Sequence, residues 1–218
     1  MSPEEAVWLG NTLQKFESSK LSPMINIGSS SPGYRRQACS EIETHVFNVL
    51  RERGVKVYHA DMKNEDGIDI VGDICDKTVQ DHIKAMNPKA LLCNNILEHI
   101  TDRDIFCNAC SHLLPKDGLL FVSVPYKYPY HPDPVDTGFR SDIDGIKGLF
   151  KDFEIIDGEI ITFGNYLLNL TKRKKLLLRD AYLIFAGMVR PDKWKVLLDN
   201  YRFFLSPFKV TCSVLRKL

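Results

Sequence analysis

Hydrophobic and polar positions alternate between two periods along most of the chain. Short apolar runs of strand type are each followed by a segment in which apolar residues recur every three or four positions, as in a helix that faces a core. The expected strands are residues 24–27, 55–60, 68–71, 90–93, 119–124, 153–162 and 208–215. The expected helices are residues 1–20, 34–53, 77–86, 101–114 and 141–150, followed by a largely helical stretch, 165–207.

Alternating strands and helices with short connections predict an α/β fold, a doubly wound and mostly parallel seven-stranded sheet with helices on both faces. The length of 218 residues suits a single domain, residues 1–218. We expect it to carry an N-terminal helical segment at 1–22, and a helical insertion or lid at 165–207 before the last strand.

The overall net charge of +1 hides an uneven distribution. From Asn165 onward the chain has twelve Lys or Arg residues against three Asp. Such a basic segment is either a solvated helix face or a surface for an anionic partner. Because aromatic residues are mixed with these charges, residues 165–207 suit a lid over the substrate, a dimer contact or a peripheral contact with anionic lipid. Basic and aromatic residues interleave too briefly to indicate nucleic-acid binding, and we expect none.

Six cysteines are scattered, several of them inside apolar runs, as is usual for buried thiols in a reducing compartment. The only pair at metal spacing is Cys107-x-x-Cys110, with His112 nearby, and no second pair matches it, so we expect no metal site. The N-terminus lacks a signal pattern, and the longest apolar run, 181–189, is shorter than the roughly 20 residues that span a bilayer. These features predict a cytoplasmic protein.

The loop Gly28-Ser-Ser-Ser-Pro-Gly33 joins the first expected strand of the sheet to a long helix. Backbone N–H groups and a helix N-terminus at the end of a strand commonly hold a nucleotide-like ligand. A phosphate-binding P-loop is disfavoured because Tyr34-Arg35 stands where Lys and Ser or Thr are required. A dinucleotide fingerprint is disfavoured because the middle glycine is missing.

A third interpretation comes from the order of the motifs, which resembles the class I, Rossmann-like S-adenosylmethionine-dependent methyltransferases. The resemblance covers about residues 24–162, with the last expected strand as the seventh. The motifs are, in chain order, the loop Gly28–Gly33, Asp61 after the second strand, Gly72-Asp73-Ile74, Asn94-Asn95-Ile-Leu-Glu98-His99, and Leu114-Pro-Lys-Asp-Gly118-Leu-Leu-Phe-Val-Ser-Val-Pro125.

This resemblance implies S-adenosylmethionine as the cofactor and assigns roles at the strand ends. Asp61 is expected to accept hydrogen bonds from both ribose hydroxyls, since a carboxylate offers lone pairs to two neighbouring donors. Asp73 is expected to accept from the adenine amino group, and the Ile74 backbone N–H to donate to a ring nitrogen. Asn94 is expected near the methionine carboxylate or amine.

The resemblance also implies that the loop with Gly28, Ser29 and Ser30 wraps the methionine part of the cofactor. Two features depart from the family pattern. Asn26 stands where an acidic residue is usual, and Ser30 stands in the glycine-rich stretch, where it adds a Cβ and resists positive φ. Weaker cofactor binding follows, and with it a second hypothesis, that the chain is a catalytically silent binding or scaffold protein of the same fold.

Methyl transfer to an oxygen acceptor needs a group that removes a proton. His131, in the proline- and tyrosine-rich loop after the fifth strand, is the first candidate, with Asp133 as its orienting partner or as an alternative base. His99 is the second candidate. Simpler roles are also open, a turn histidine held by prolines for His131 and a structural hydrogen bond for His99. The aromatic loop suggests a small-molecule or sugar (glycan) acceptor, methylated at oxygen.

Overall fold

The computed structural model describes residues 1–33, 35, 40–131, 135–172 and 174–218. Its centre is a seven-stranded sheet with the order β3-β2-β1-β4-β5-β7-β6. All strands run parallel except β7, which is antiparallel to both of its neighbours. The strands are β1 (Met24–Ile27), β2 (Val57–Asp61), β3 (Ile70–Val71), β4 (Ala90–Asn94), β5 (Leu119–Lys127), β6 (Phe153–Phe163) and β7 (Phe208–Lys217).

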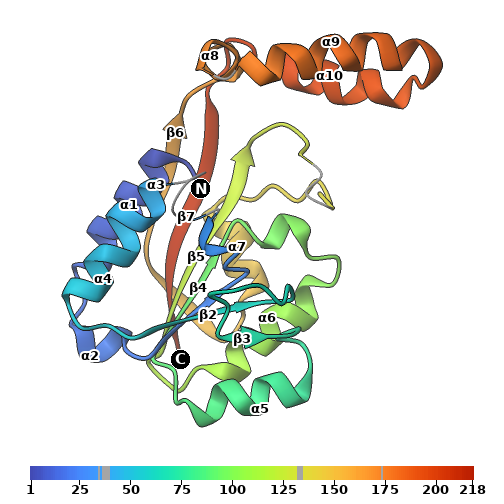
Figure 1. Cartoon of the computed structure of the whole chain (residues 1–218). Helices are drawn as coiled ribbons and strands as arrows, with labels where there is room; N and C mark the ends of the chain where they lie inside the picture. Colours follow the sequence, from blue (N-terminus) through green and yellow to red (C-terminus); the bar gives the residue numbers. More distant parts are fainter. Residues whose placement is uncertain (34, 36–39, 132–134, 173) are drawn as a thin grey trace.

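Helices cover both faces of this sheet, as Figure 1 shows. On one face lie α1 (Pro3–Leu13), α2 (Ser18–Leu21), α3 (Ser40–Ile42), the π-helical turn η2 (Glu43–Phe47) and α4 (Asn48–Glu52). On the other lie α5 (Lys77–Ala85), the short η3 (Leu97–His99), α6 (Arg103–Leu113) and α7 (Ile143–Leu149). The predicted fold class is therefore confirmed.

The central strands are apolar on both sides because each side faces a separate hydrophobic cluster. In β4, Leu92 packs into the cluster beneath α1 and α4, whereas Leu91 and Cys93 pack into the cluster beneath α5, α6 and α7. This alternation follows from the two-residue period of a strand. It fixes the orientation of the strand ends, from which the polar residues of the site project.

The N-terminal segment differs from its prediction as one helix over residues 1–20, because α1 ends at Leu13 and α2 is a separate short helix. A capping box starts α1. The Ser2 Oγ accepts from the Glu5 backbone N–H at 3.1 Å, and Glu5 Oε2 accepts from the Ser2 N–H at 3.2 Å. The cap matters for the site because it turns the buried Glu5 side chain toward the ends of β4 and β5.

Three helices lie between β6 and β7, beyond the edge at which the parallel strands end. They are α8 (Tyr166–Lys172), α9 (Lys174–Val189) and α10 (Asp192–Arg202). In Figure 1, α9 and α10 run side by side and project away from the body as a helical hairpin. Gly187 permits their close approach, since a Cβ there would lie 2.0 Å from Trp194 Cδ1. In the part of the chain that is described, no helix combines the length and apolarity needed to cross a bilayer.

Candidate active site

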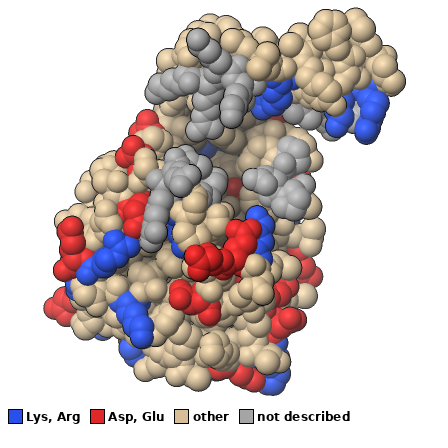
Figure 2. Space-filling view, in the orientation of Figure 1, with Lys and Arg blue, Asp and Glu red and all other residues tan. Residues whose placement is uncertain are grey.

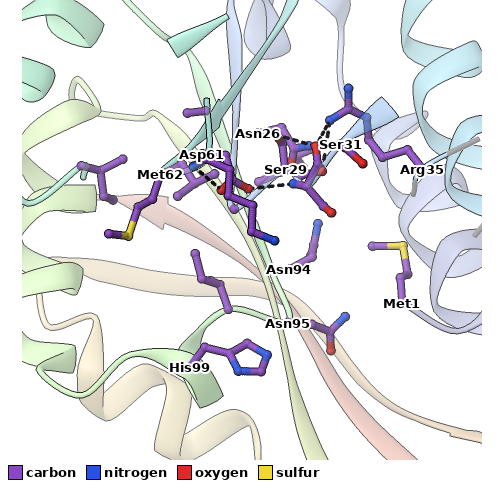
Figure 3. A pocket seen from close by; sticks show the side chains of 18 of the residues that line it. Met1, Asn26, Ser29, Ser31, Arg35, Asp61, Met62, Asn94, Asn95 and His99 are labelled. Atoms are coloured by element: carbon purple, nitrogen blue, oxygen red, sulfur yellow. Dashed lines mark hydrogen bonds between the residues drawn. The ribbon is translucent and has the colours of Figure 1, made fainter. Parts of the chain in front are cut away.

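A cavity of about 690 Å³ opens at the carboxyl edge of β1, β2 and β4. This volume lies within the usual range for small-molecule sites. Figure 3 shows Asp61 and Arg35 on opposite sides of the Gly28 loop, with Asn94, Asn95 and His99 along a second wall. The cavity wall includes every position to which the resemblance assigns a cofactor contact: Asn26, Gly28, Ser29, Ser30, Asp61, Asp73, Ile74 and Asn94.

The Gly28 loop is held in a conformation that glycine favours. Gly28 has a φ of 66°, and a Cβ there would lie 2.7 Å from Ile96 Cδ1. Ser30 also adopts a left-handed conformation, with a φ of 54°, which costs a non-glycine residue about 1–2 kcal/mol. Its backbone N–H donates to Asp61 Oδ2 at 2.9 Å, which helps to offset that strain. The loop is therefore joined to the end of β2 without any ligand.

Arg35 is a structural part of this loop that the sequence did not single out. Its side chain is buried and donates to the carbonyl oxygens of Ser29 at 3.1 Å, Ser30 at 2.6 Å and Gly67 at 3.3 Å. Glycine is needed at 67 because a Cβ there would lie 2.2 Å from Pro32 Cγ. Arg35 thus ties the Gly28 loop to the loop between β2 and β3. The only indication of this role in the sequence is that Arg35 stands two residues after the loop.

The side chain of Asn26 forms a hydrogen bond with a residue of β2. Its Nδ2 lies 3.2 Å from His59 Nδ1. Burial, with the positive charge of Arg35 adding to it, lowers the pKa of His59 to about 4, so the ring is neutral near pH 7. A neutral ring accepts at one nitrogen, and the amide of Asn26 donates to it. Asn26 therefore serves to join β1 to β2 beneath the cavity.

The two aspartates at the strand ends keep acceptor capacity for a ligand. Asp61 accepts from Ser30 through Oδ2 and from the Lys63 N–H through Oδ1 at 3.1 Å. Asp73 Oδ1 accepts from the Cys75 N–H at 2.8 Å. A carboxylate has about four acceptor positions, so these bonds leave lone pairs on both side chains at the cavity wall.

Glu5 reaches the same edge from the N-terminal helix. It is only 2% exposed, and its Oε1 accepts from Asn95 Nδ2 at 2.8 Å and from Ser123 Oγ at 2.5 Å. Asn95 has a φ of 51°, a left-handed conformation that asparagine tolerates better than most residues. Glu5 therefore fixes the ends of β4 and β5 to each other. The capping-box spacing of Ser2 and Glu5 was its only sequence signal.

The structure brings the two candidate histidines together although they are 32 positions apart in the sequence. The ring centroids of His99 and His131 lie 5.5 Å apart. His99 lines the cavity, whereas His131 lies behind it in the loop that follows β5. Between them lies Glu98, which is completely buried, and burial raises its pKa to about 7. The other candidate base, Asp133, falls outside the described residues.

The loop around His131 is held by a buried ion pair. Asp136, only 6% exposed, accepts from Arg140 through both oxygens, at 3.0 Å for Oδ1 and 2.8 Å for Oδ2. It also accepts from the backbone N–H groups of His131 and Gly138, at 2.9 and 2.8 Å. Although burial alone would raise the pKa of Asp136, these donors outweigh it and hold the pKa at about 2. The hydrogen bond from its backbone N–H to the buried Asp136 therefore fixes the position of His131.

The cysteine pair at metal spacing, Cys107 and Cys110, lies in the hydrophobic core. Cys107 and Cys110 are both buried in α6, and burial raises the pKa of each thiol well above its usual value. Cys110 Sγ lies 3.9 Å from Cys93 Sγ. Thiols in such surroundings pack as small apolar side chains and are poor metal ligands.

Neither a protein-family model nor a curated protein sequence matches this chain. Solved structures do match its fold. An S-adenosylmethionine-dependent methyltransferase from Archaeoglobus fulgidus has a TM-score of 0.56 at 13% identity, covering 99% of this chain and 95% of its own. Coclaurine N-methyltransferase, solved with N-methylheliamine and S-adenosylhomocysteine, has a TM-score of 0.53 at 13% identity, covering 97% and 72%.

The chain has the class I methyltransferase fold. The resemblance inferred from the motifs is thereby confirmed at the level of the fold. The same fold also occurs in the [4+2]-cyclase SpnF, which matches with a TM-score of 0.57 at 11% identity and covers 95% of this chain and 80% of its own. Among proteins of the methyltransferase fold, activity therefore has to be argued from the residues of the site.

Proposed function

We propose that this chain is an S-adenosylmethionine-dependent methyltransferase that acts on a small-molecule or sugar acceptor, at oxygen. The observation that carries the proposal is the convergence of the eight cofactor positions on one cavity at the carboxyl edge of the sheet. In open α/β sheets, ligands bind at this edge. The fold by itself is compatible with many activities. The carboxylates of Asp61 and Asp73 at the cavity wall favour those that use a ligand with hydroxyl or amino donors.

The residues present suit the cofactor. Asp61 can accept from ribose hydroxyls with the lone pairs that Ser30 and Lys63 leave available. Asp73, one strand further along the edge, and the buried Ile74 beside it are placed to meet the adenine ring. S-adenosylmethionine, when bound, supplies a methyl group on a sulfonium. The remaining task of the protein is to position an acceptor and to manage its proton.

The acceptor is proposed to lie near His99 and His131. Of the three tyrosines that the sequence suggested for stacking, Tyr128 packs against Phe163 and Phe208, with ring centroids 6.1 and 4.8 Å away. Tyr126 and Tyr130 are each 41% exposed and are available to an acceptor ring. Exposed aromatic rings can stack on a phenol or a sugar, and an imidazole can take the proton of an acceptor hydroxyl.

An acceptor screen tests this proposal. We expect the purified chain, given cofactor labelled in the methyl group, to label phenols, catechols or monosaccharides, and to leave the matching amines unlabelled. Heat-inactivated chain gives the background rate. Label that appears only in amines would contradict the oxygen acceptor and would instead support nitrogen methylation.

A catalytically silent binding or scaffold protein is the second candidate function, and two observations favour it. Asn26 is engaged with His59 and brings no negative charge to a cofactor ammonium, and Ser30 places a Cβ in the loop. The occurrence of a [4+2]-cyclase on the same fold supports the view that methyl transfer need not be retained.

The helical hairpin carries a row of exposed apolar side chains. Along α9, Leu178, Tyr182, Phe185 and Val189 are spaced as one helix face and are 64–85% exposed. On α10 and just after it, the spacing repeats at Trp194, Leu198, Tyr201 and Leu205. In the view of Figure 2, the upper side of the hairpin shows neither acidic nor basic side chains, whereas basic ones gather along its lower side. Contiguous apolar patches of this kind mark interaction sites.

We propose that the hairpin rests on an anionic membrane surface. Residues 165–207 contain nine Lys or Arg against three Asp, an excess that complements acidic headgroups, and the exposed apolar side chains can enter the interface. The hairpin is also connected to the site, because Asp199 of α10 accepts from the Tyr130 backbone N–H at 2.7 Å, one residue before His131. Lipid contact would therefore act close to the acceptor.

Vesicle flotation tests the membrane contact. We expect the chain to float with phosphatidylcholine vesicles that contain phosphatidylserine and to stay in solution with phosphatidylcholine alone. The double variant Leu178→Ser/Val189→Ser should lose this flotation. Ile105→Ser, which removes an exposed apolar side chain from α6, should keep it. Absence of flotation, with concentration-dependent dimerisation by sedimentation, would contradict the proposal and indicate that a second copy covers the hairpin.

A further inference from the structure

Glu98, His99 and His131 form a compact cluster behind one end of the cavity. Glu98 Oε1 lies 3.9 Å from His99 Nε2 and 4.0 Å from His131 Nε2. One ligand atom from each of the three residues can be chosen so that all lie within 4.8 Å of one another. In the described residues this is the only group of three or more His, Cys, Asp or Glu side chains with that property.

The carboxylate of Glu98 is buried, but no described residue forms a hydrogen bond with it. The residue is 0% exposed, and neither of its oxygens has a hydrogen-bond partner among the described residues. A buried polar group without a partner costs about 1–3 kcal/mol, and a charged one costs more. Oε1 faces the two imidazoles, so the unsatisfied group points at the centre of the cluster.

The hydrogen bonds of the histidines determine which ring nitrogen faces Glu98. His99 Nδ1 contacts the carbonyl oxygen of Val135, and His131 Nδ1 lies 3.2 Å from the carbonyl oxygen of Pro129 and 3.1 Å from Asp136 Oδ2. Carbonyl and carboxylate oxygens only accept, so each Nδ1 carries the hydrogen. In a neutral ring, Nε2 then presents a lone pair toward Glu98. With Glu98 ionised and both rings neutral, the three described side chains therefore direct acceptors at one another with no donor between them.

We propose that Glu98, His99 and His131 bind a divalent first-row transition metal ion. Two imidazoles and one carboxylate form a donor set typical of catalytic zinc and of non-haem iron. Metal-bound histidines usually donate their second N–H to a carbonyl or carboxylate, as both of these rings do. Zn–N bonds of about 2.0–2.1 Å place neighbouring ligand atoms roughly 3.3 Å apart. The two gaps from Glu98 Oε1, 3.9 and 4.0 Å, and the third, which is at most 4.8 Å, can close to that spacing by side-chain rotation.

The proposed ion deepens the proposed function and rests on it. Three protein ligands leave at least one coordination position open, and His99 borders the cavity at this place. An acceptor hydroxyl bound there would lose its proton more readily because the metal acts as a Lewis acid. The imidazoles would then serve as ligands, and the metal would take over the task that the sequence assigned to a histidine base. No metal site was expected from the sequence, because that expectation rested only on the spacing of Cys107 and Cys110.

Cobalt titration of the untagged full chain tests the site directly. After treatment with chelator, we expect the chain to bind one Co²⁺, with the visible absorption of an ion held by nitrogen and oxygen ligands, and Zn²⁺ to displace it. Glu98→Gln and His131→Gln should each weaken Co²⁺ binding at least tenfold. His112→Gln, which changes an exposed histidine on α6, should leave the affinity unchanged.

The melting temperature and the S-adenosylhomocysteine affinity of Glu98→Gln distinguish a failure of the metal site from a failure of the proposed function. Glu98→Gln should melt no lower than the metal-free wild type, because the amide fills the same volume without a buried charge. Its affinity for S-adenosylhomocysteine should equal that of the wild type. Wild-type Co²⁺ affinity in Glu98→Gln, or no stoichiometric uptake by the wild type, would overturn the metal site even if S-adenosylhomocysteine binds. Metal binding without S-adenosylhomocysteine binding would instead overturn the proposed methyl transfer.

Discussion

Replacement of Asp61 by alanine is expected to weaken binding of S-adenosylhomocysteine at least tenfold, or about 1.4 kcal/mol. The variant loses the carboxylate proposed to accept from both ribose hydroxyls, and charge-assisted hydrogen bonds are stronger than neutral ones. It also loses the acceptor for the Ser30 N–H, which holds the Gly28 loop against the end of β2. Isothermal titration calorimetry gives the affinity, and a melting curve shows whether the variant is folded.

Two controls isolate the role of the Asp61 charge. Asp61→Asn keeps one oxygen that can accept from Ser30, so its affinity should fall between those of the wild type and the alanine variant. Asp81→Ala removes an equal charge from the exposed side of α5, away from the cavity, and should change nothing. An affinity of Asp61→Ala equal to that of the wild type would refute the ribose assignment.

Replacement of Asp136 by alanine is expected to lower the free energy of unfolding by about 3–5 kcal/mol. The substitution leaves the guanidinium of Arg140, whose side chain is only 18% exposed, without its bidentate partner. It also removes the acceptor for the His131 and Gly138 backbone N–H groups. Urea denaturation followed by circular dichroism measures the loss.

A surface ion pair of the same type is the matched control. Arg216 and Glu154 also form a close pair, but their side chains are 46% and 42% exposed. Glu154→Ala should therefore cost less than about 1 kcal/mol. Equal losses for Asp136→Ala and Glu154→Ala would show that the loop around His131 is not held by the buried pair.

The fold was predictable because its signals are local. Short apolar runs and helical spacing predicted every strand and the order of the elements along the chain, whereas the antiparallel direction of β7 was seen only in the structure. The errors lie at helix boundaries, one of which is decided by side-chain capping. The helix predicted over residues 101–114 begins at Arg103, because the side chain of Asp102 accepts from the Ile105 N–H and makes Asp102 the N-cap of α6. The break between α1 and α2 was also missed, and there no side chain caps the start of α2.

The site was predictable only where a residue follows a strand. Asp61, Asp73 and Asn94 were expected near one another because parallel strands end at one edge, and all three line the cavity, whereas their roles stay predictions. Glu5, Arg35 and the pairing of His99 with His131 depend on contacts between distant segments, which no local pattern records. Glu98 belongs to the motif Asn94–His99, but only the structure shows that it is completely buried and that its side chain has no hydrogen-bond partner among the described residues.

Calorimetric titration of the wild-type chain with S-adenosylhomocysteine tests the central claim most directly. The cavity, the Gly28 loop held by the Ser30–Asp61 hydrogen bond, and the free lone pairs of Asp61 and Asp73 predict saturable binding at one site per chain. No detectable heat at millimolar ligand would contradict the methyltransferase proposal. The Ser30 and Asn26 departures would then mark a protein that keeps the methyltransferase fold for binding or scaffolding alone.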